Sequence, residues 1–347
     1  MEFAFKKGFG SDNHCPVHPK IMQALVDANR GHLPSYGTDE LCTRATDVFR
    51  KHFGSRTEVF FVFNGTAANT LSLRAMTRSF NTVFCADISH IYNDECAAPE
   101  IIGQCKLIPL AAKNGKITAA QIEEHLVRLG DQHATQPKAV SITQPTEMGT
   151  VYSIEEIKTI CDVAKRHGLY VHIDGARLPN ACVSLNCTFS QMTSDLGVDV
   201  VSFGGTKNSL MFGEAILFLN TTLAKDFQYI RKQCLQLPSK SRYIAAQFLA
   251  LFDDNLWRTN SEYILKLAKR LRDEVRDIPH VKVTQEVQSN AVFAEIPKSF
   301  LKPLREKFFF YVWDERTFEC RWMISFDTTE QEIIEFAQIL RELSKKM

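Results

Sequence analysis

Short apolar runs alternate with amphipathic stretches along the first two thirds of this chain of 347 residues. Such runs are typical of strands buried on both faces of a sheet, whereas apolar side chains repeated every three or four residues are typical of helices. The expected strands cover residues 58–63, 82–85, 106–110, 139–143, 169–173, 198–203 and 215–219. The alternation predicts an α/β fold in which helices flank a mostly parallel sheet, and the run at 58–63 is expected to be a buried parallel strand.

Helical patterns fill the segments between these strands. They are expected over residues 19–29, over a segment ending near 53, and over 67–76, 118–129 and 153–168. Thr118 with Gln121 and Ser153 with Glu156 have the spacing of capping boxes, in which each side chain pairs with the other residue's backbone. Residues 139–173 therefore form a complete strand–helix–strand unit.

The pattern changes after about residue 252. A long helix is expected, followed by short apolar runs and a final amphipathic helix. These elements cover residues 261–276, 281–283, 291–296, 308–312, 321–325 and 329–343. This part resembles a smaller α+β domain, so we divide the chain into a large domain at 16–252 and a small C-terminal domain at 253–347. No internal repeat or low-complexity segment interrupts them.

Composition and charge exclude several classes of protein. The net charge is +1, with 45% hydrophobic and 23% charged residues, and no basic tract is present, so a nucleic-acid partner is not expected. No apolar run approaches the ~20 residues of a membrane span, and the first residues lack the apolar core of an export signal. Ten cysteines are scattered without CxxC or zinc-ligand spacing, which predicts reduced thiols, no metal site and a cytoplasmic location.

The most unusual local sequence surrounds Lys207. One apolar run ends at Phe203, the pair Gly204–Gly205 interrupts it, and a second run begins at Ala215. A long, strongly hydrated lysine on a glycine-rich turn between two buried strands contributes little to stability. A lysine amine does, however, form a Schiff base with an aldehyde cofactor. Lys207 is therefore the first candidate for a functional residue.

Asp174 lies at the carboxyl end of an expected buried strand, the edge at which open α/β sheets bind ligands. A carboxylate there is costly unless a cation pairs with it, and a protonated pyridine nitrogen would be such a partner. The alternative is a structural aspartate that caps the next helix or pairs with Arg177.

Three weaker candidates follow the same logic. Residues Asn64, Gly65 and Thr66 stand between an expected strand and a helix, where a glycine, a hydroxyl and free backbone amides suit a phosphate; the alternative is a simple helix N-cap. His90 follows another short strand and could stack on a flat cofactor or exchange protons; the alternative is a structural histidine. Arg321 opens an apolar run and could bind a planar anion; the alternative is an internal salt bridge.

The order of these residues along the chain is more specific than any one of them. A Gly–Thr pair, a histidine, an aspartate at a strand end, a lysine about thirty residues later and a late arginine resemble the pyridoxal phosphate (PLP) enzymes of the aspartate-aminotransferase fold, fold type I. Within that fold, the chain is most similar to the low-specificity threonine aldolase, or β-eliminating lyase, family. The resemblance covers nearly the whole chain and rests on Ser11–Asp12, Tyr36–Gly37, Gly65–Thr66–Ala67, His90, residues 172–177 and Lys207.

The resemblance implies a cofactor site. By the family pattern, Lys207 holds PLP covalently, Asp174 pairs with the pyridine nitrogen, and His90 stacks on the ring. Residues 64–66 match those that hold the phosphate. Arg177 is included among the cofactor-binding residues as well.

The resemblance also implies a substrate site. Ser11, Arg177 and Arg321 match the residues that grip the substrate carboxylate. Because Ser11 lies near the start of the chain, the N-terminal segment 1–15 is expected to contribute to the active site.

Two further matches imply an oligomer. Tyr36 matches a tyrosine that the family draws from a neighbouring subunit. Arg242 matches a phosphate-binding arginine supplied across the dimer, and Lys240 is the alternative residue for that alignment. Shared sites of this kind imply a homo-oligomer, which is at least a dimer and in this family commonly a tetramer.

The implied activity is that of an aldolase that cleaves L-threonine, L-allo-threonine or related β-hydroxy-α-amino acids to glycine and an aldehyde. The arginine clamp fixes the carboxylate, and a base takes the β-hydroxyl proton as the Cα–Cβ bond breaks. That base would be His90 or a water that it orders. His172 lies two residues before Asp174 on the same strand face, where it would support Asp174.

Several residues depart from the family pattern. Thr206 and Asn208 flank the lysine where members often have serine and glycine, and Asn64 replaces the usual serine. Residues 144–150 lack the Asn–Thr–His type of sequence and resemble a bacterial branch that includes phenylserine-cleaving aldolases. An aromatic substrate such as phenylserine, or broad specificity, is therefore an alternative to threonine.

The sequence leaves two other functions open. One is another PLP enzyme of the same fold, either a β-eliminating lyase that releases pyruvate and ammonia or an aminotransferase, because its cofactor site would be identical. The other is a non-enzymatic α/β binding module in which Lys207 is a surface residue of a turn.

Overall fold

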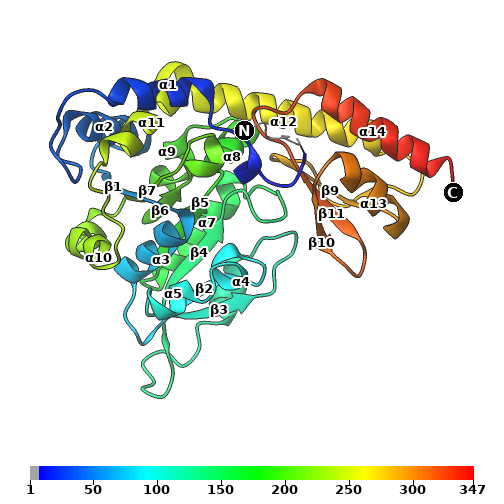
Figure 1. The fold of residues 1–347 in the computed structure, drawn as a ribbon. Helices are drawn as coiled ribbons and strands as arrows, with labels where there is room; N and C mark the ends of the chain where they lie inside the picture. Colours follow the sequence, from blue (N-terminus) through cyan, green and yellow to red (C-terminus); the bar gives the residue numbers. More distant parts are fainter. Residues whose placement is uncertain (1–7) are drawn as a thin grey trace.

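The computed structural model describes residues 8–347, and the strands of this part of the chain form two sheets (Figure 1). The larger, seven-stranded sheet has the order β1-β7-β6-β5-β4-β2-β3. Its strands are β1 (Glu58–Val62), β2 (Asn81–Ala86), β3 (Lys106–Leu110), β4 (Gln136–Thr143), β5 (Tyr170–Gly175), β6 (Val200–Phe203) and β7 (Glu214–Phe218). Strands β2 to β6 pair in parallel, and β7 runs antiparallel to both β6 and β1. The prediction of an α/β fold with a mostly parallel sheet is confirmed.

Strand β1 differs from its prediction. It lies at an edge of the sheet and pairs antiparallel with β7, with Glu58 opposite Phe218 and Val62 opposite Glu214. The expectation of a parallel strand at 58–63 was therefore wrong. An apolar run carries no information about strand direction. Strand β7 folds back on β6 after the loop at 204–213, and β1 adds to the outer side of β7.

Helices cover both faces of the large sheet (Figure 1). On one face lie α2 (Glu40–Phe53), α6 (Ala119–Glu124), α7 (Ile154–Arg166), α8 (Leu178–Leu185), α9 (Phe189–Met192) and α11 (Arg242–Phe252), with α1 (Pro19–Ala28) against α11. On the other face lie α3 (Gly65–Met76) and α10 (Phe227–Gln233), with the short helices α4 (His90–Asn93) and α5 (Ala98–Ile101) beside α3. The sheet is thus the middle of three layers, and ligands can reach it at the ends of its strands.

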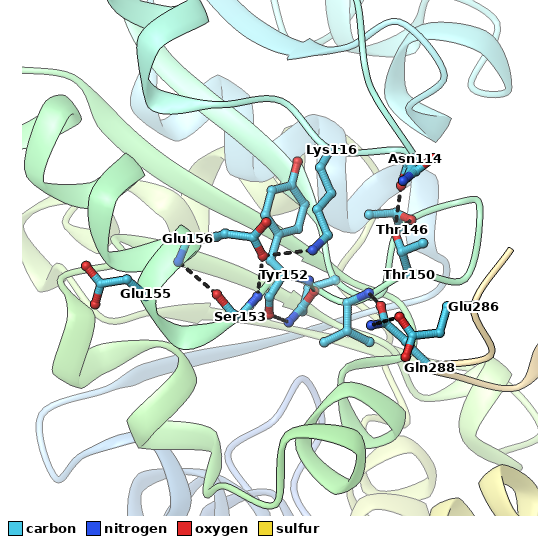
Figure 2. Close-up of polar contacts among 12 residues, drawn as sticks. Asn114, Lys116, Thr146, Thr150, Tyr152, Ser153, Glu155, Glu156, Glu286 and Gln288 are labelled. Carbon is cyan, nitrogen blue, oxygen red and sulfur yellow. Dashed lines mark hydrogen bonds and ion pairs between the residues drawn. The ribbon is translucent and has the colours of Figure 1, made fainter.

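Both predicted capping boxes are present. Figure 2 shows the second one, in which Ser153 Oγ accepts from the backbone of Glu156 at 3.1 Å and the Glu156 carboxylate accepts from the backbone of Ser153 at 2.6 Å. Lys116 adds an ion pair to Glu156 at 2.7 Å. Next to this cap, the backbone of Val151 donates to Gln288 of the C-terminal part of the chain at 2.7 Å. The end of the loop that leads into α7 is therefore fixed by contacts from two other segments of the chain.

The first capping box opens a helix that is shorter than predicted. Helix α6 ends at Glu124, earlier than the apolar pattern suggests. The chain turns because Arg128 has a φ of 57° and because the Gln136 side-chain amide donates to the carbonyls of Arg128, Asp131 and Ala134. These bonds fix the backbone of the loop between α6 and β4.

A cluster of phenylalanine rings forms the centre of the core on one face of the large sheet. The Phe49 ring of α2 lies between 5.1 and 6.2 Å from the rings of Phe53, Phe61, Phe203 and Phe248. Aromatic pairs at such distances combine a large buried area with specific edge-to-face geometry. Phe203 is the last residue of β6, so this cluster anchors the strand end from which the lysine turn begins.

The smaller sheet is antiparallel and has the order β10-β11-β9-β8. Its strands are β8 (Lys282–Val283), β9 (Ala291–Glu295), β10 (Tyr311–Asp314) and β11 (Glu319–Met323). Helices α12 (Leu256–Val275), α13 (Lys298–Lys307) and α14 (Glu330–Ser344) pack with it around a second core. Helix α13 was not predicted, because it is rich in lysine and contains Pro303, which obscures the helical pattern.

Helix α12 connects the two parts of the molecule (Figure 1). Its first turn, with Leu256 and Trp257, belongs to the core of the large sheet, and the rest packs into the core of the small one. The predicted domain boundary after residue 252 falls at the end of α11. Residues 1–7 of the predicted N-terminal segment lie outside the described residues, and Phe9 packs into the core of the small sheet.

Residues 8–347 contain neither a membrane-spanning helix nor a cluster of metal ligands. No helix in this range combines the length and the apolar character needed to cross a membrane. No group of three or more His, Cys, Asp or Glu side chains within the same range is arranged to hold a metal ion. The ten cysteines are all free thiols.

Candidate active site

A cavity of about 240 Å³ lies where β5 and β6 end and α3 begins. Its lining includes six residues that the sequence singled out: Asn64, Gly65, Thr66, His90, Asp174 and Lys207. Four further polar lining residues were not singled out: Asn13, which lies in the N-terminal segment expected to contribute to the site, Asn69, Ser202 and Glu214. Two strand ends, a helix start and a turn thus converge at the edge where α/β sheets bind ligands.

The turn that carries Lys207 is held by close packing and by Asn208. A Cβ atom on Gly204 would lie 2.1 Å from the carbonyl oxygen of Ala176, so only glycine fits there. The Asn208 side-chain amide donates to the carbonyls of Ala176 at 3.1 Å and Gly204 at 2.7 Å. Asn208, one of the departures from the family pattern, therefore ties the lysine turn to the end of β5.

The Lys207 side chain is largely buried in the cavity and lies among charges of both signs. Burial is the largest cause that lowers the pKa of Lys207; Arg177 adds to it, and Asp12 and Asp174 oppose it. A lowered pKa leaves more of the amine neutral near pH 7. The neutral amine is the form that attacks an aldehyde carbon.

Asp174 is 4% exposed at the end of β5. Its Oδ2 accepts from Asn69 Nδ2 at 2.8 Å, and its Oδ1 accepts from the backbone of Ala176 at 3.0 Å. Arg177, one of the partners considered for it, binds Asp12 instead. A buried carboxylate that receives neutral amide donors still favours a cation close by, which suits a protonated ring nitrogen.

Helix α3 begins at the cavity with Gly65 and Thr66. The Asn64 side chain is the N-cap and accepts from the backbone of Ala67 at 2.9 Å, so the structural alternative considered for this residue is present. No atom lies within 4 Å of the place where a Cβ on Gly65 would be. The open space faces the first turn of α3, where free N–H groups and the helix dipole favour an anion such as a phosphate.

A chain of hydrogen bonds links His90 to Asp174. His90 Nδ1 lies 2.9 Å from Glu95 Oε1, and Asn69 Nδ2 donates to the same glutamate oxygen and to Asp174, both at 2.8 Å. The bond to Glu95 is the largest cause that raises the pKa of His90, and burial opposes it. Because Nδ1–H donates its hydrogen bond to the carboxylate, Nε2 of the neutral ring remains a hydrogen-bond acceptor.

Glu147 supports His90 from the backbone side. Its Oε1 accepts from the His90 N–H and from the Thr143 hydroxyl, both at 2.8 Å. Burial raises the pKa of Glu147 to about 7, and the neighbouring Asp174 adds to the effect. Glu147 lies in the irregular segment 144–150, where no periodic pattern indicated that its side chain would point inward.

His172 is fully buried, and both of its ring nitrogens have partners. Nδ1 lies 2.9 Å from Ser141 Oγ, and Nε2 lies 2.9 Å from Ser202 Oγ. Burial lowers the pKa of His172 to about 4, so the ring is neutral at physiological pH. The prediction that His172 supports Asp174 was therefore wrong about the partner: its hydrogen bonds go to two serines, one of which lines the cavity.

The two arginines predicted to bind the substrate lie beside the cavity, outside its lining. Arg177 forms a buried ion pair with Asp12, in which Nε lies 2.5 Å from Oδ2 and Nη2 lies 2.8 Å from Oδ1. Asn290 of the small domain donates to the same Asp12 at 3.1 Å. Arg321 stacks on Trp313 at 5.0 Å, and burial together with the nearby Arg177 lowers its pKa. The two cations thus converge on Asp12 at the junction of the two sheets.

Three other predicted residues also lie outside the cavity lining. Ser11 caps the short 3₁₀ turn that contains Asp12. Tyr36 is 51% exposed, and its backbone donates to Ser239 at 2.9 Å. Arg242, at the start of α11, donates to two backbone carbonyls of the loop after α1. Tyr36 and Arg242 therefore share one surface that the chain does not fold onto its own cavity.

The residues present fit the cofactor that the sequence implied. A lysine amine of lowered pKa, a buried carboxylate held by amides and an open helix start face one cavity. These are the groups that an aldehyde, a pyridinium nitrogen and a phosphate require. The cavity and the mostly parallel sheet define a PLP-dependent enzyme of fold type I.

Comparison with known proteins also indicates a PLP-dependent enzyme, and it identifies the family within that class. Residues 8–297 match the family model described as beta-eliminating lyase. The low specificity L-threonine aldolase of Pseudomonas sp. (strain NCIMB 10558) is 41% identical over 338 residues, which cover 96% of each chain. The chain belongs to the β-eliminating lyase family, and it is a PLP-dependent lyase.

Solved structures agree with this assignment. A threonine aldolase of Leishmania major superposes with a TM-score of 0.92 at 28% identity, covering 97% of this chain and 99% of the other. An aspartate aminotransferase of Rhizobium meliloti shares the fold, with a TM-score of 0.70 at 15% identity and coverage of 95% and 89%. The non-enzymatic binding module that the sequence left open is excluded by the family.

Proposed function

We propose that this enzyme cleaves the Cα–Cβ bond of β-hydroxy-α-amino acids such as L-threonine and L-allo-threonine, giving glycine and an aldehyde. The observation that carries the proposal is the single cavity faced by Lys207, Asp174 and His90, with two arginines beside it. The name of the relative with 41% identity, a low specificity L-threonine aldolase, supports the same reaction.

When bound, PLP supplies an electron sink for the carbanion left at Cα. Lys207 would hold the cofactor through Nζ, because burial keeps this amine reactive toward an aldehyde. Asp174 would keep the ring nitrogen protonated, because a carboxylate stabilises a cation at that place. Residues 64–66 would hold the phosphate at the start of α3.

Arg177, Arg321 and Ser11 bind the substrate carboxylate. The ion pair with Asp12 uses Nε and Nη2 of Arg177, which keeps the guanidinium in one orientation and leaves Nη1 to the substrate. A fixed carboxylate decides which bond at Cα is aligned to break. His90 accepts the β-hydroxyl proton at Nε2, directly or through one water, because Nδ1 is committed to Glu95.

The protein also acts as a homo-oligomer, at least a dimer, in the cytoplasm. Tyr36 and Arg242 share a surface apart from the cavity, as expected of residues that serve the site of a neighbouring copy. Ten free thiols, most of them buried, suit a reducing compartment. In that setting, the reaction would belong to amino acid metabolism and would supply glycine.

Product analysis tests this function directly. Purified protein incubated with L-threonine, L-allo-threonine or phenylserine is expected to release glycine and the matching aldehyde in equal amounts. A higher kcat/KM for phenylserine than for threonine would identify an aromatic β-hydroxy amino acid as the preferred substrate. Pyruvate with ammonia would instead indicate a β-eliminating lyase, and amino transfer to a keto acid an aminotransferase. No aldehyde from any of the three substrates would contradict the proposal.

The pairing of His90 with Glu95 predicts a shift in pH dependence. Glu95→Gln removes the charged acceptor that raises the pKa of His90, so this pKa falls. The neutral imidazole, which accepts a proton, then persists to lower pH, and the acidic limb of the kcat/KM profile moves to lower pH. Glu156→Gln, at the surface cap of α7, is the control. An unchanged acidic limb in Glu95→Gln would show that Glu95 does not set the protonation of His90.

A further inference from the structure

The turn between β6 and β7 binds a buried carboxylate, that of Glu214. Glu214 is the first residue of β7, is 6% exposed and lines the same cavity as Lys207. Its Oε2 accepts from the Gly205 N–H at 2.5 Å, and the neighbouring Thr206 lowers the pKa of this carboxyl. The start of the turn that carries Lys207 is therefore bound to one side chain.

The local backbone requires an acceptor at this place. Gly205 is buried, and a Cβ atom on it would lie 2.2 Å from the carbonyl oxygen of Gly213, so the turn packs tightly against the start of β7. Residues Thr206–Asn208 form a single 3₁₀ turn, and the first N–H groups of such a turn have no partner within it. A buried N–H without a partner is costly. Glu214 supplies the missing acceptor.

The same carboxylate affects the charge of Lys207. Glu214 is one of the acidic groups that oppose the lowering of the pKa of Lys207, and Lys207 in turn lowers that of Glu214. Burial nevertheless raises the pKa of Glu214 to about 7. Glu214 thus combines two effects on one lysine: it binds the backbone that carries the lysine, and it places a negative charge near the amine.

We propose that Glu214 is a positioning residue for Lys207, which fixes the turn below the lysine and holds a carboxylate in the cavity that the amine enters. This inference rests on the proposed role of Lys207 as the residue that binds the cofactor. An amine that would hold a cofactor and exchange it with substrate has to occupy the same place in every cycle. A turn held by Glu214 keeps that place fixed while the lysine side chain is unattached.

The test uses two Glu214 variants and one matched control in the full-length chain. Glu214→Gln keeps an acceptor oxygen but loses the charge, and Glu214→Ala loses both. Asp199→Asn is the control, because Asp199 is a largely buried carboxylate at the opposite end of the same sheet, where it accepts from Val171 and Asn220. Bound aldehyde is first removed with hydroxylamine. The pH dependence of Lys207 modification by trinitrobenzenesulfonate, the dissociation constant of added PLP and the melting temperature are then measured.

Both Glu214 variants are expected to move the midpoint of Lys207 modification to lower pH, because they remove a negative charge that stabilises the ammonium form. Asp199→Asn should leave this midpoint in place. Glu214→Ala should weaken PLP binding by about tenfold or more, the usual effect of losing hydrogen bonds to a charged acceptor, whereas Glu214→Gln should stay within about threefold of the wild type. If PLP affinity is retained in Glu214→Gln but lost in Glu214→Ala, the hydrogen bonds of Glu214 and not its charge support PLP binding.

Two results would overturn the inference. One is an unshifted midpoint in Glu214→Gln, and the other is wild-type affinity for PLP in a folded Glu214→Ala protein. If thermal melting shows that Glu214→Ala does not fold, the inference is judged by the pH midpoint of Lys207 modification in Glu214→Gln. If the wild-type chain binds no PLP, the proposed function fails, while the midpoint of Lys207 modification still decides the role of Glu214.

Discussion

Lys207→Ala should lower the turnover of β-hydroxy amino acids by about 10⁴-fold or more and leave the fold intact. The lost amine is the nucleophile that binds the cofactor, and Lys207 is the lysine that lines the cavity in the described part of the chain. The stability cost should be small, because the substitution removes an amine that burial already disfavours in its charged form. Steady-state assays measure the loss of turnover, and circular dichroism with thermal melting measures the fold.

Lys138→Ala is the matched control for this variant. Lys138 lies toward the opposite end of the large sheet, where its amine stacks on Tyr170 at 4.5 Å. Its loss should leave turnover within about threefold of the wild type, as for surface changes away from a site. A Lys207→Ala protein that cleaved substrate at the wild-type rate would refute the role given to Lys207.

Asp174→Asn should lower kcat by about 10²–10³-fold, the usual cost of removing one electrostatic stabiliser from an active site. The substitution keeps the size of the side chain and an oxygen for the backbone of Ala176, but it removes the charge that holds the proton on the ring nitrogen. PLP binding should fall less than kcat, because Lys207 and the start of α3 still hold the cofactor. Steady-state kinetics and the amount of PLP per chain separate the two effects.

Asp199→Asn serves again as the comparison, since it removes a buried carboxylate from the far end of the same sheet. Its kcat should match that of the wild type even if its melting temperature falls. A wild-type kcat in Asp174→Asn with full PLP content would mean that the reaction does not need a carboxylate at the ring nitrogen.

The site residues that could be predicted from the sequence lie where an apolar run ends or where a strand gives way to a helix. Lys207 follows a glycine pair at the end of an apolar run, Asp174 ends another run, and Gly65 with Thr66 separates a strand from a helix. Strand ends and helix starts are fixed by local sequence, and in α/β folds they meet at the ligand-binding edge. These residues indeed line one cavity in the structure.

What the sequence did not reveal are contacts between distant segments. Asn69, which was not singled out, binds Asp174 across 105 positions, and the predicted Arg177 binds Asp12 across 165. Nothing in a single sequence encodes such pairs, because they depend on how the layers pack. Glu214 did carry a visible signal, since an acidic residue that opens a fully apolar run is expected to have a buried partner.

Two larger features also could not be read from the local sequence: the direction of β1, and the role of the surface that carries Tyr36 and Arg242. An apolar run indicates burial, yet the antiparallel pairing of β1 follows from the reversal between β6 and β7. The expected oligomer requires a second copy of the chain. The sequence pattern around Tyr36 and Arg242 does not by itself indicate a contact with that copy.

The central claim is that a PLP-dependent aldolase site is built on Lys207, and borohydride reduction of the purified protein followed by peptide mapping tests it most directly. The account predicts a yellow protein that is bleached by reduction and carries a pyridoxyl group on the peptide containing Lys207. A colourless protein, or a label on another residue such as Lys240, would contradict it.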